Sequence, residues 1–103
     1  MALYVDPLMP CEPTPQWRYR KSCHLFADTD EELHEFARRH GIWKCNFHEN
    51  TPIGNYYLLN WSSRWWAVFN GAKALNAKQT VRKRRQIWPH LAARPKVTEA
   101  TNR

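Results

Sequence analysis

Short apolar runs separated by turn residues dominate the first quarter of the chain. The run from Ala2 to Val5 is rich in strand-forming residues, and Asp6-Pro7 ends it. The stretch that follows, up to Gln16, is rich in proline, which predicts an irregular loop. A second run over residues 22–27 is too short for a helix and predicts a buried strand.

The clearest helix signal lies at residues 29–41. Thr29 and Glu32 form a capping box, in which the hydroxyl and the carboxylate satisfy free amides at the start of a helix. Four residues then recur with the spacing of one helical face, and Gly41 follows as a C-terminal cap. The pattern predicts a helix from about 30 to 40, with its inner face made by Leu33, Phe36, Ala37 and His40.

Residues 42–54 contain several turn-forming residues and predict irregular structure, whereas residues 56–59 predict a third strand. Asn60 is a suitable N-cap for a helix from about 61 to 70 that ends at Gly71.

A fourth short strand is expected over residues 72–75, before the last helix. Asn76 and Gln79 form another capping-box pattern, and the helix after them runs to about Ile87. Pro89 then ends it, and Pro95 with the polar tail discourages a further helix.

Alternating strands and helices indicate an α/β fold: a small compact domain of three or four short strands with three helices. A chain of 103 residues has room for one modest core. We therefore expect a single domain over residues 1–88 and a basic C-terminal tail over residues 89–103.

The charges divide the chain into two unlike halves. Residues 1–57 carry six Lys/Arg and eight Asp/Glu, whereas residues 58–103 carry ten and one, so the second half has a balance of +9. This half cannot neutralise itself and should attract anions such as nucleic-acid phosphates or acidic protein surfaces. The simpler alternative is a tail that serves solubility.

Three cysteines lack the paired spacing of a disulfide framework or a zinc site, and no signal-peptide pattern precedes them. Reduced thiols in the cytoplasm fit best. The nearest approach to a metal site, Cys45 and His48 with His40 upstream, is a loose half-site, so neither a metal nor another cofactor is expected. No apolar stretch reaches the length of a membrane span.

Three separated segments resemble one known family. They are residues 4–7 (YVDP), residues 23–29 (CHLFADT) and residues 31–37 (EELHEFA). The family is the bacterial and phage domain of unknown function 4031, and the resemblance covers about residues 2–75. It implies an α/β layout, a bacterial or phage setting and no established activity.

The resemblance also implies that two polar side chains of the family are missing here. The family shows a His-Tyr-Asp-Leu pattern before its penultimate helix, and the matching residues here are Tyr56-Tyr57-Leu58-Leu59. The His and the Asp are absent, so any acid–base or metal chemistry that they served in relatives is expected to be lost.

Asp6, His24 and Asp28 are weak candidates for a catalytic site, because they lie at the ends of two predicted strands. Ligands often collect at strand ends in α/β sheets, and a His beside a carboxylate can act as a general base. The alternative without catalysis is favoured, in which Asp28 caps a turn, Asp6 starts the proline-rich loop and His24 is a packed core residue. No nucleophile motif or phosphate-binding glycine loop accompanies them.

The last predicted helix is the stronger candidate for a site. Lys78, Arg82 and Arg85 fall on one helical face, with Lys83 and Arg84 beside them. Such a stripe can follow a phosphate backbone and bind it in a salt-sensitive manner.

Six tryptophans are unusual in a chain of this length. Trp61, Trp65 and Phe69 share one helical stripe, whereas Trp66 points about 100° away from Trp65. We expect Trp61 to join the core with Val68 or Phe69. The other indoles, with Trp88 beside the basic helix, should be partly exposed, as at interface hot spots and base-stacking surfaces.

The sequence therefore predicts a non-catalytic binding protein, phage-encoded, that engages nucleic acid or a nucleic-acid-processing host protein, for example as an inhibitor of a host nuclease or defence complex. A small enzyme and a homo-oligomerising structural module are the alternatives. The predicted binding residues are Arg64, Trp65, Trp66, Lys78, Arg82, Lys83, Arg84, Arg85 and Trp88.

Overall fold

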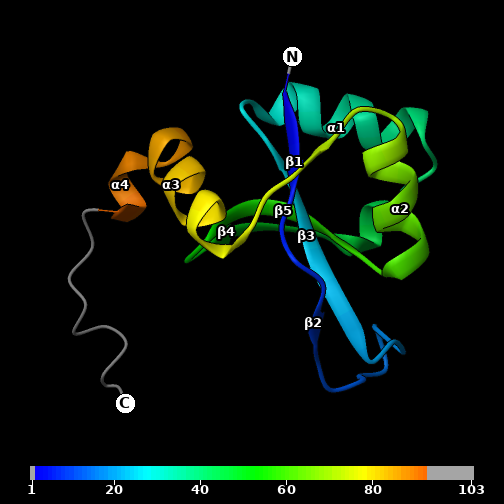
Figure 1. The fold of residues 1–103 in the computed structure, drawn as a ribbon. Helices are drawn as coiled ribbons and strands as arrows, with labels where there is room; N and C mark the ends of the chain where they lie inside the picture. The colour runs from blue at the N-terminus through cyan, green and yellow to red at the C-terminus, as the bar shows by residue number, and fades with distance from the viewer. Residues whose placement is uncertain (1, 93–103) are drawn as a thin grey trace.

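The fold is a mixed β-sheet with helices on both sides, seen in a computed structural model that describes residues 2–92 (Figure 1). Five strands follow the order β4-β5-β3-β1-β6, and β2 pairs with β3 outside this path. β1 and β6 are parallel, and the other pairs are antiparallel. The strands are β1 Leu3–Val5, β2 Met9–Pro10, β3 Lys21–Ala27, β4 Phe47–Thr51, β5 Gly54–Leu59 and β6 Lys73–Ala74.

Three main helices begin at the caps that the sequence indicates. The Thr29 side chain accepts a hydrogen bond from the Glu32 amide, and Asn60 and Asn76 each form a reciprocal capping box. Among residues 2–92, no helix is both long and apolar enough to cross a membrane. The helices are α1 Asp30–Arg39, α2 Trp61–Phe69, α3 Ala77–Ile87 and the single turn α4 Pro89–Ala92, with a 3₁₀ turn, η1, at Lys44–Asn46.

The hydrophobic core lies between one face of the sheet and helices α1 and α2. Leu25 of β3 pairs with Val5 on one side and Tyr57 on the other, so these three side chains share a face. Leu33 and Phe36 of α1 cover them, and α2 adds only Ala67. A mixed sheet whose apolar face is covered by helices confirms the α/β prediction.

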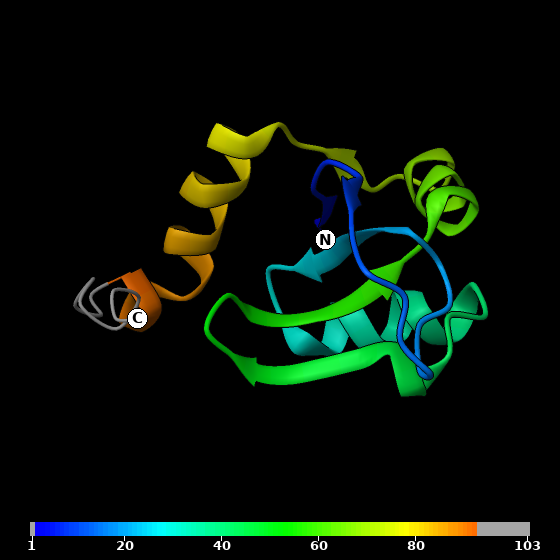
Figure 2. The ribbon, with the colours of Figure 1, turned by 90° about the horizontal axis from the view of Figure 1, so that it is seen from below.

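Helix α3 lies against the opposite face of the sheet through side-chain contacts. The Trp88 ring packs 6.1 Å from the Phe26 ring, and the Lys83 ammonium lies 5.0 Å from the centre of the Tyr4 ring. Gly54 allows the close approach of Trp88, because its φ is +97° and an added Cβ would lie 2.6 Å from the indole. Figure 2 shows α2 and α3 at opposite ends of the molecule.

Three predictions of irregular structure are wrong. Residues 42–54 contain η1 and β4, a polar strand that has no apolar alternation and exists because it pairs with β5. Met9 and Pro10 pair with β3 within the proline-rich stretch, since an edge strand tolerates a proline. Pro89 begins the short α4 after α3 ends, because proline suits the first turn of a helix. The tail beyond Ala92 lies outside the described residues.

Candidate functional site

Asp6 lies at the end of β1, is only 7% exposed and joins three other elements. Its Oδ1 accepts a hydrogen bond from the His24 amide at 2.6 Å, and its Oδ2 contacts His24 Nδ1 at 2.6 Å. Arg84 of α3 forms an ion pair with the same Oδ2 at 3.1 Å. Arg64 of α2 donates from Nε to the Asp6 backbone carbonyl at 3.0 Å. One residue thus ties β3, α2 and α3 to β1.

The electrostatics of this cluster keep Asp6 ionised. Burial alone would raise the pKa of Asp6, but the hydrogen bonds from His24 and the charge of Arg84 lower it below its usual value. Burial lowers the pKa of Arg84, and the neighbouring Asp6 opposes that effect. An arginine stays protonated in either case, so the pair is a charged one at neutral pH.

His24 has one ring nitrogen committed to Asp6 and an aromatic neighbour. Its ring meets the Tyr56 ring edge-on, with centroids 4.4 Å apart, and burial raises the pKa of Tyr56. Leu58 is the direct partner of His24 in the β3–β5 ladder. If His24 donates from Nδ1 to Asp6, the lone pair at Nε2 is the group that can accept a proton.

The third weak catalytic candidate lies elsewhere. Asp28 is opposite Ala2 at the far end of the β1–β3 ladder, where it accepts a hydrogen bond from the Tyr4 hydroxyl at 3.0 Å. Burial and this hydrogen bond raise the pKa of Tyr4 to about 12. The prediction that Asp28 joins Asp6 and His24 is therefore wrong, because the antiparallel β1–β3 ladder places Asp6 beside His24 and Asp28 beside Ala2 at its other end.

Helix α3 has a cationic outer side and a sheet-facing inner side. Lys78, Arg82 and Arg85 are exposed and line a shallow hollow with Val81. None of these three cations forms an ion pair within the part of the chain that the structure describes. We call Lys78, Arg82 and Arg85 the cation row.

Arg84 and Lys83, in contrast, point toward the sheet. Arg84 pairs with Asp6 and lies over Phe26, and Lys83 lies over Tyr4. Trp88 also faces inward, against Phe26. These three residues belong to the contact between α3 and the sheet, which corrects their prediction as part of an outward surface.

Helix α2 has the reverse arrangement. Its one charged residue, Arg64, donates to Asp6, and its large aromatic side chains face solvent. Trp61 is 68% and Phe69 67% exposed, so the prediction that Trp61 joins the core with Val68 or Phe69 is wrong. Trp65 and Trp66 are both more than half exposed, as the angle between them suggested.

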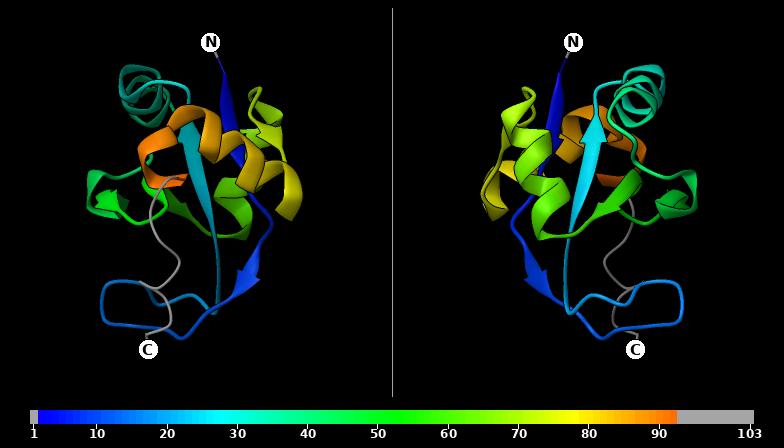
Figure 3. Two further views of the ribbon diagram at one scale, coloured as in Figure 1. Left: turned by 90° about the vertical axis from the view of Figure 1, so that its left-hand side faces the viewer. Right: turned by 90° about the vertical axis from the view of Figure 1, so that its right-hand side faces the viewer.

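The predicted single basic, tryptophan-rich surface is in fact two surfaces. Figure 3 shows α3 in front when the molecule is viewed from one side and α2 in front from the other. The cation row and Trp65 with Trp66 therefore lie on opposite sides of the sheet. Helices α2 and α3 are consecutive in the sequence, but the segment between them, which contains β6, carries the chain from one side of the molecule to the other.

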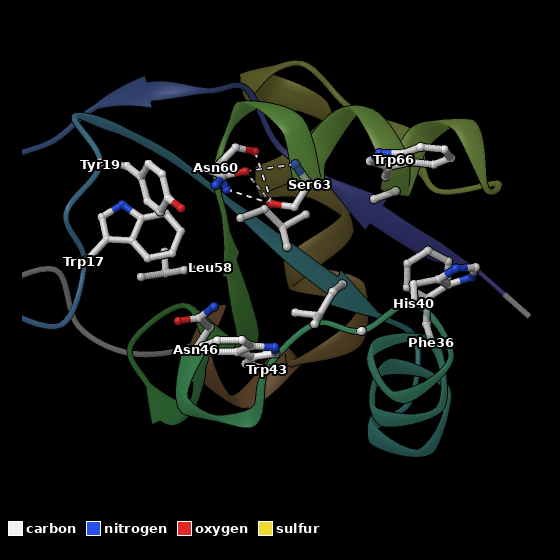
Figure 4. A pocket seen from close by; sticks show the side chains of 14 residues that line it. Trp17, Tyr19, Phe36, His40, Trp43, Asn46, Leu58, Asn60, Ser63 and Trp66 are labelled. Atoms are coloured by element: carbon white, nitrogen blue, oxygen red, sulfur yellow. Dashed lines mark hydrogen bonds between the residues drawn. The ribbon is translucent and has the colours of Figure 1, made fainter.

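An aromatic cleft of about 320 Å³ opens beside α2 (Figure 4). Trp17 and Tyr19 from the β2–β3 loop stand at one end, and Trp66 of α2 stands at the other. Trp43, just before η1, forms part of the wall and is 74% exposed. The lining residues include no Asp, Glu, Lys or Arg.

No motif or helical spacing in the sequence indicated Trp17, Tyr19 or Trp43 as site residues. The available signal was the number of aromatic residues, which exceeds what one small core accommodates. Their convergence depends on the path of the loops, and no local pattern indicates it.

The fold and these features define a class: a small α/β domain that carries a cation row on one side and exposed aromatic residues on the other. A family model described as "Protein of unknown function (DUF4031)" matches residues 3–87, so the chain belongs to this family. The match extends beyond residue 75, where the resemblance was expected to end, and includes α3. Neither a curated protein nor a solved structure matches the chain.

Proposed function

We propose that the protein binds nucleic acid through the cation row of α3. The observation that carries this proposal is that Lys78, Arg82 and Arg85 are exposed on one helical face and form no ion pair among the described residues. Two exposed cations on another helix differ from this row, because Arg38 and Arg39 both pair with Glu35.

The spacing of the row suits a phosphate backbone. Seven residues of α-helix separate Lys78 from Arg85, a rise of roughly 10 Å. Successive phosphates of one strand are about 3.4 Å apart along a duplex axis, so the row spans about three of them. Binding of this kind is largely independent of sequence and weakens as salt rises.

The contact between α3 and the sheet supports this role. The Arg84–Asp6 ion pair and the packing of Trp88 hold the helix, so the row is presented on a fixed element. A preorganised site loses less conformational entropy on binding than a mobile tail does.

Fluorescence anisotropy with labelled duplex and single-stranded DNA tests the proposal. Neutralising about three phosphates predicts a slope of about −2.7 for log K against log salt on duplex DNA, or about 40-fold weaker binding between 50 and 200 mM salt. The triple variant Lys78→Gln, Arg82→Gln, Arg85→Gln should lose most of the affinity and flatten this slope.

The matched control is Arg38→Gln, Arg39→Gln, Lys44→Gln, which removes the same net charge from α1 and η1. It should keep most of the affinity. Equal losses in both triple variants would show that net charge alone attracts the DNA. An absence of binding at low salt would contradict the proposal and favour the other expected target, a nucleic-acid-processing host protein that a phage-encoded chain inhibits.

Acid–base catalysis is a second candidate function, favoured by the 2.6 Å contact between Asp6 and His24 Nδ1. The resemblance argues against it, because Tyr56 and Leu58, where the family's His and Asp are missing, are both neighbours of His24. Incubation of wild type and His24→Asn with labelled DNA and RNA distinguishes catalysis from a packing role for His24. Catalysis predicts cleavage that the variant loses while its unfolding transition is unchanged, whereas a packing role predicts no cleavage and a less stable variant.

A further inference from the structure

We propose that the exposed side of α2 is the interface between two copies of this chain. The surface consists of the outward side chains of α2 together with Trp43 at the rim of the aromatic cleft, and we call it the aromatic face. Its members are Trp43, Trp61, Trp65, Trp66 and Phe69. The proposal is independent of nucleic-acid binding, which uses the other side of the molecule.

The aromatic face exposes far more apolar surface than a solitary small domain needs to. Its five members are between 52% and 74% exposed, and all are Trp or Phe. Single exposed apolar residues are ordinary, but a contiguous group of large ones, such as Trp65, Trp66 and Phe69 here, marks an interaction site. Trp and other aromatic residues are also enriched where interfaces bind most strongly.

The side chains on α2 already hold one another in place. The Trp65 and Phe69 rings stack at 5.3 Å and 8°, and Trp66 meets both rings edge-on. They form a ridge whose rotamers are restrained before any partner arrives. Binding through such a ridge costs little side-chain entropy.

The distribution of charge makes this face the place where a second copy can approach. The chain has a net charge of +7, so two copies repel one another over most of their surfaces. The outer side of α2 carries no charged side chain, because Arg64 turns inward to Asp6. The cleft lining also lacks Asp, Glu, Lys and Arg, so two copies can meet here without placing like charges against one another. Interfaces between identical chains are typically apolar and depleted of charge in this manner.

Shape favours the same partner. A two-fold interface must be self-complementary, which requires a protruding part and a matching hollow on one surface. The aromatic face has both: the ridge on α2 and, beside it, the cleft bounded by Trp43 and Trp66 (Figure 4). The cleft, at about 320 Å³, has room for a large side chain from the ridge of the other copy.

An anionic membrane surface fits less well. Helices that lie on membranes carry Lys or Arg beside their apolar face. Here α3, which carries the cation row, lies on the opposite side of the sheet from α2, so these three cations and the ridge on α2 cannot reach one membrane surface together.

Sedimentation velocity of the purified full chain in the absence of nucleic acid tests the proposal. We expect the mass to rise with concentration from 12.3 kDa to twice that value, with tryptophan emission shifting to shorter wavelength as the indoles leave water. Trp66→Arg should weaken the dimer at least tenfold, because it places like charges at the interface. Val81→Arg, at the exposed apolar residue of α3, is the matched control and should leave the dimer unchanged.

Other results would overturn the proposal. A mass of 12.3 kDa at every concentration up to about 100 µM excludes a dimer of useful affinity. A monomer that sediments with phosphatidylglycerol vesicles would assign the aromatic face to a membrane. A dimer that persists in Trp66→Arg and in the second variant Phe69→Ser uses another surface. Circular dichroism of each variant confirms that it is folded.

Discussion

Helices α2 and α3 are similar in length and begin in the same way, yet they direct opposite kinds of side chain toward the protein. Each starts at an Asn whose side chain forms a reciprocal capping box. Helix α2 turns its only charged residue, Arg64, inward and exposes its indoles. Helix α3 turns Trp88 toward the sheet and exposes three of its cations.

The difference shows that a charged residue is not always a surface residue in this small fold. Arg64 and Arg84 approach Asp6 from different helices and bind different oxygens of the same residue. A partly buried arginine is stable only when its donors are satisfied, and Asp6 supplies acceptors to both. The aromatic residues of α2 then have no core to enter, because that helix adds only Ala67 to it.

The largest expected effect comes from removing the Asp6 charge, which pairs with Arg84 of α3 and with His24. Asp6→Asn should lower the free energy of unfolding by about 4 kcal/mol, because Arg84, whose side chain is only 20% exposed, loses its anionic partner. Urea denaturation measures this loss. Asp28→Asn is the control, since that exposed carboxylate accepts one hydrogen bond and should cost about 1 kcal/mol. Similar losses in the two variants would refute the central role of Asp6.

The contribution of Asp6 to stability should also depend on pH, in a direction that follows from its pKa. The pKa of Asp6 is lowered in the folded protein, so its contribution is complete above the ordinary Asp pKa of about 3.9. It is lost as the pH falls through the lower, folded value. The stability difference between wild type and Asp6→Asn should therefore be full at pH 5 and shrink below about pH 4. A difference that grows on acidification would contradict this assignment.

A smaller effect separates inward from outward indoles. Trp88→Ala should cost about 2 to 3 kcal/mol, because it removes the ring that packs on Phe26 and Gly54. Trp61→Ala, at a position 68% exposed, should change the stability of the monomer by less than about 0.5 kcal/mol. Thermal unfolding at low protein concentration measures both. The reverse order would mean that α2, not α3, uses its indole to hold the fold.

The smallest expected effect comes from the Asn N-caps with which both helices begin. Asn60→Ala and Asn76→Ala should each cost about 1 kcal/mol, because each leaves a helix amide without its acceptor. Equal losses in chemical denaturation would indicate that both helix starts are formed in the native state to the same degree. No loss for Asn76→Ala alone would show that α3 is held only by its contacts with the sheet.

Local signals in the sequence predicted the helices well and the edge strands poorly. Thr29, Asn60 and Asn76 mark helix starts because capping is satisfied within a few residues. β4 carries a polar sequence, and its existence depends on hydrogen bonds to β5 that no local pattern encodes.

The candidate site was predicted in part. The spacing of Lys78, Arg82 and Arg85 correctly placed them on one exposed face. It did not reveal that Arg84 belongs to Asp6, a residue 78 positions away in the chain. Asp6 and His24 were candidates for one cluster, and pairing of β1 with β3 does bring them together.

The sequence by itself determined where the helices begin, which residues alternate into the core and how unevenly the charge is distributed. These properties depend on neighbours within one turn of helix or one step of a strand. Only the tertiary structure decided which cations are satisfied and which aromatic residues remain in solvent. That choice depends on whether an acceptor or an apolar face from a distant segment lies within reach, and here one buried residue, Asp6, binds Arg84 through its carboxylate and Arg64 through its backbone carbonyl.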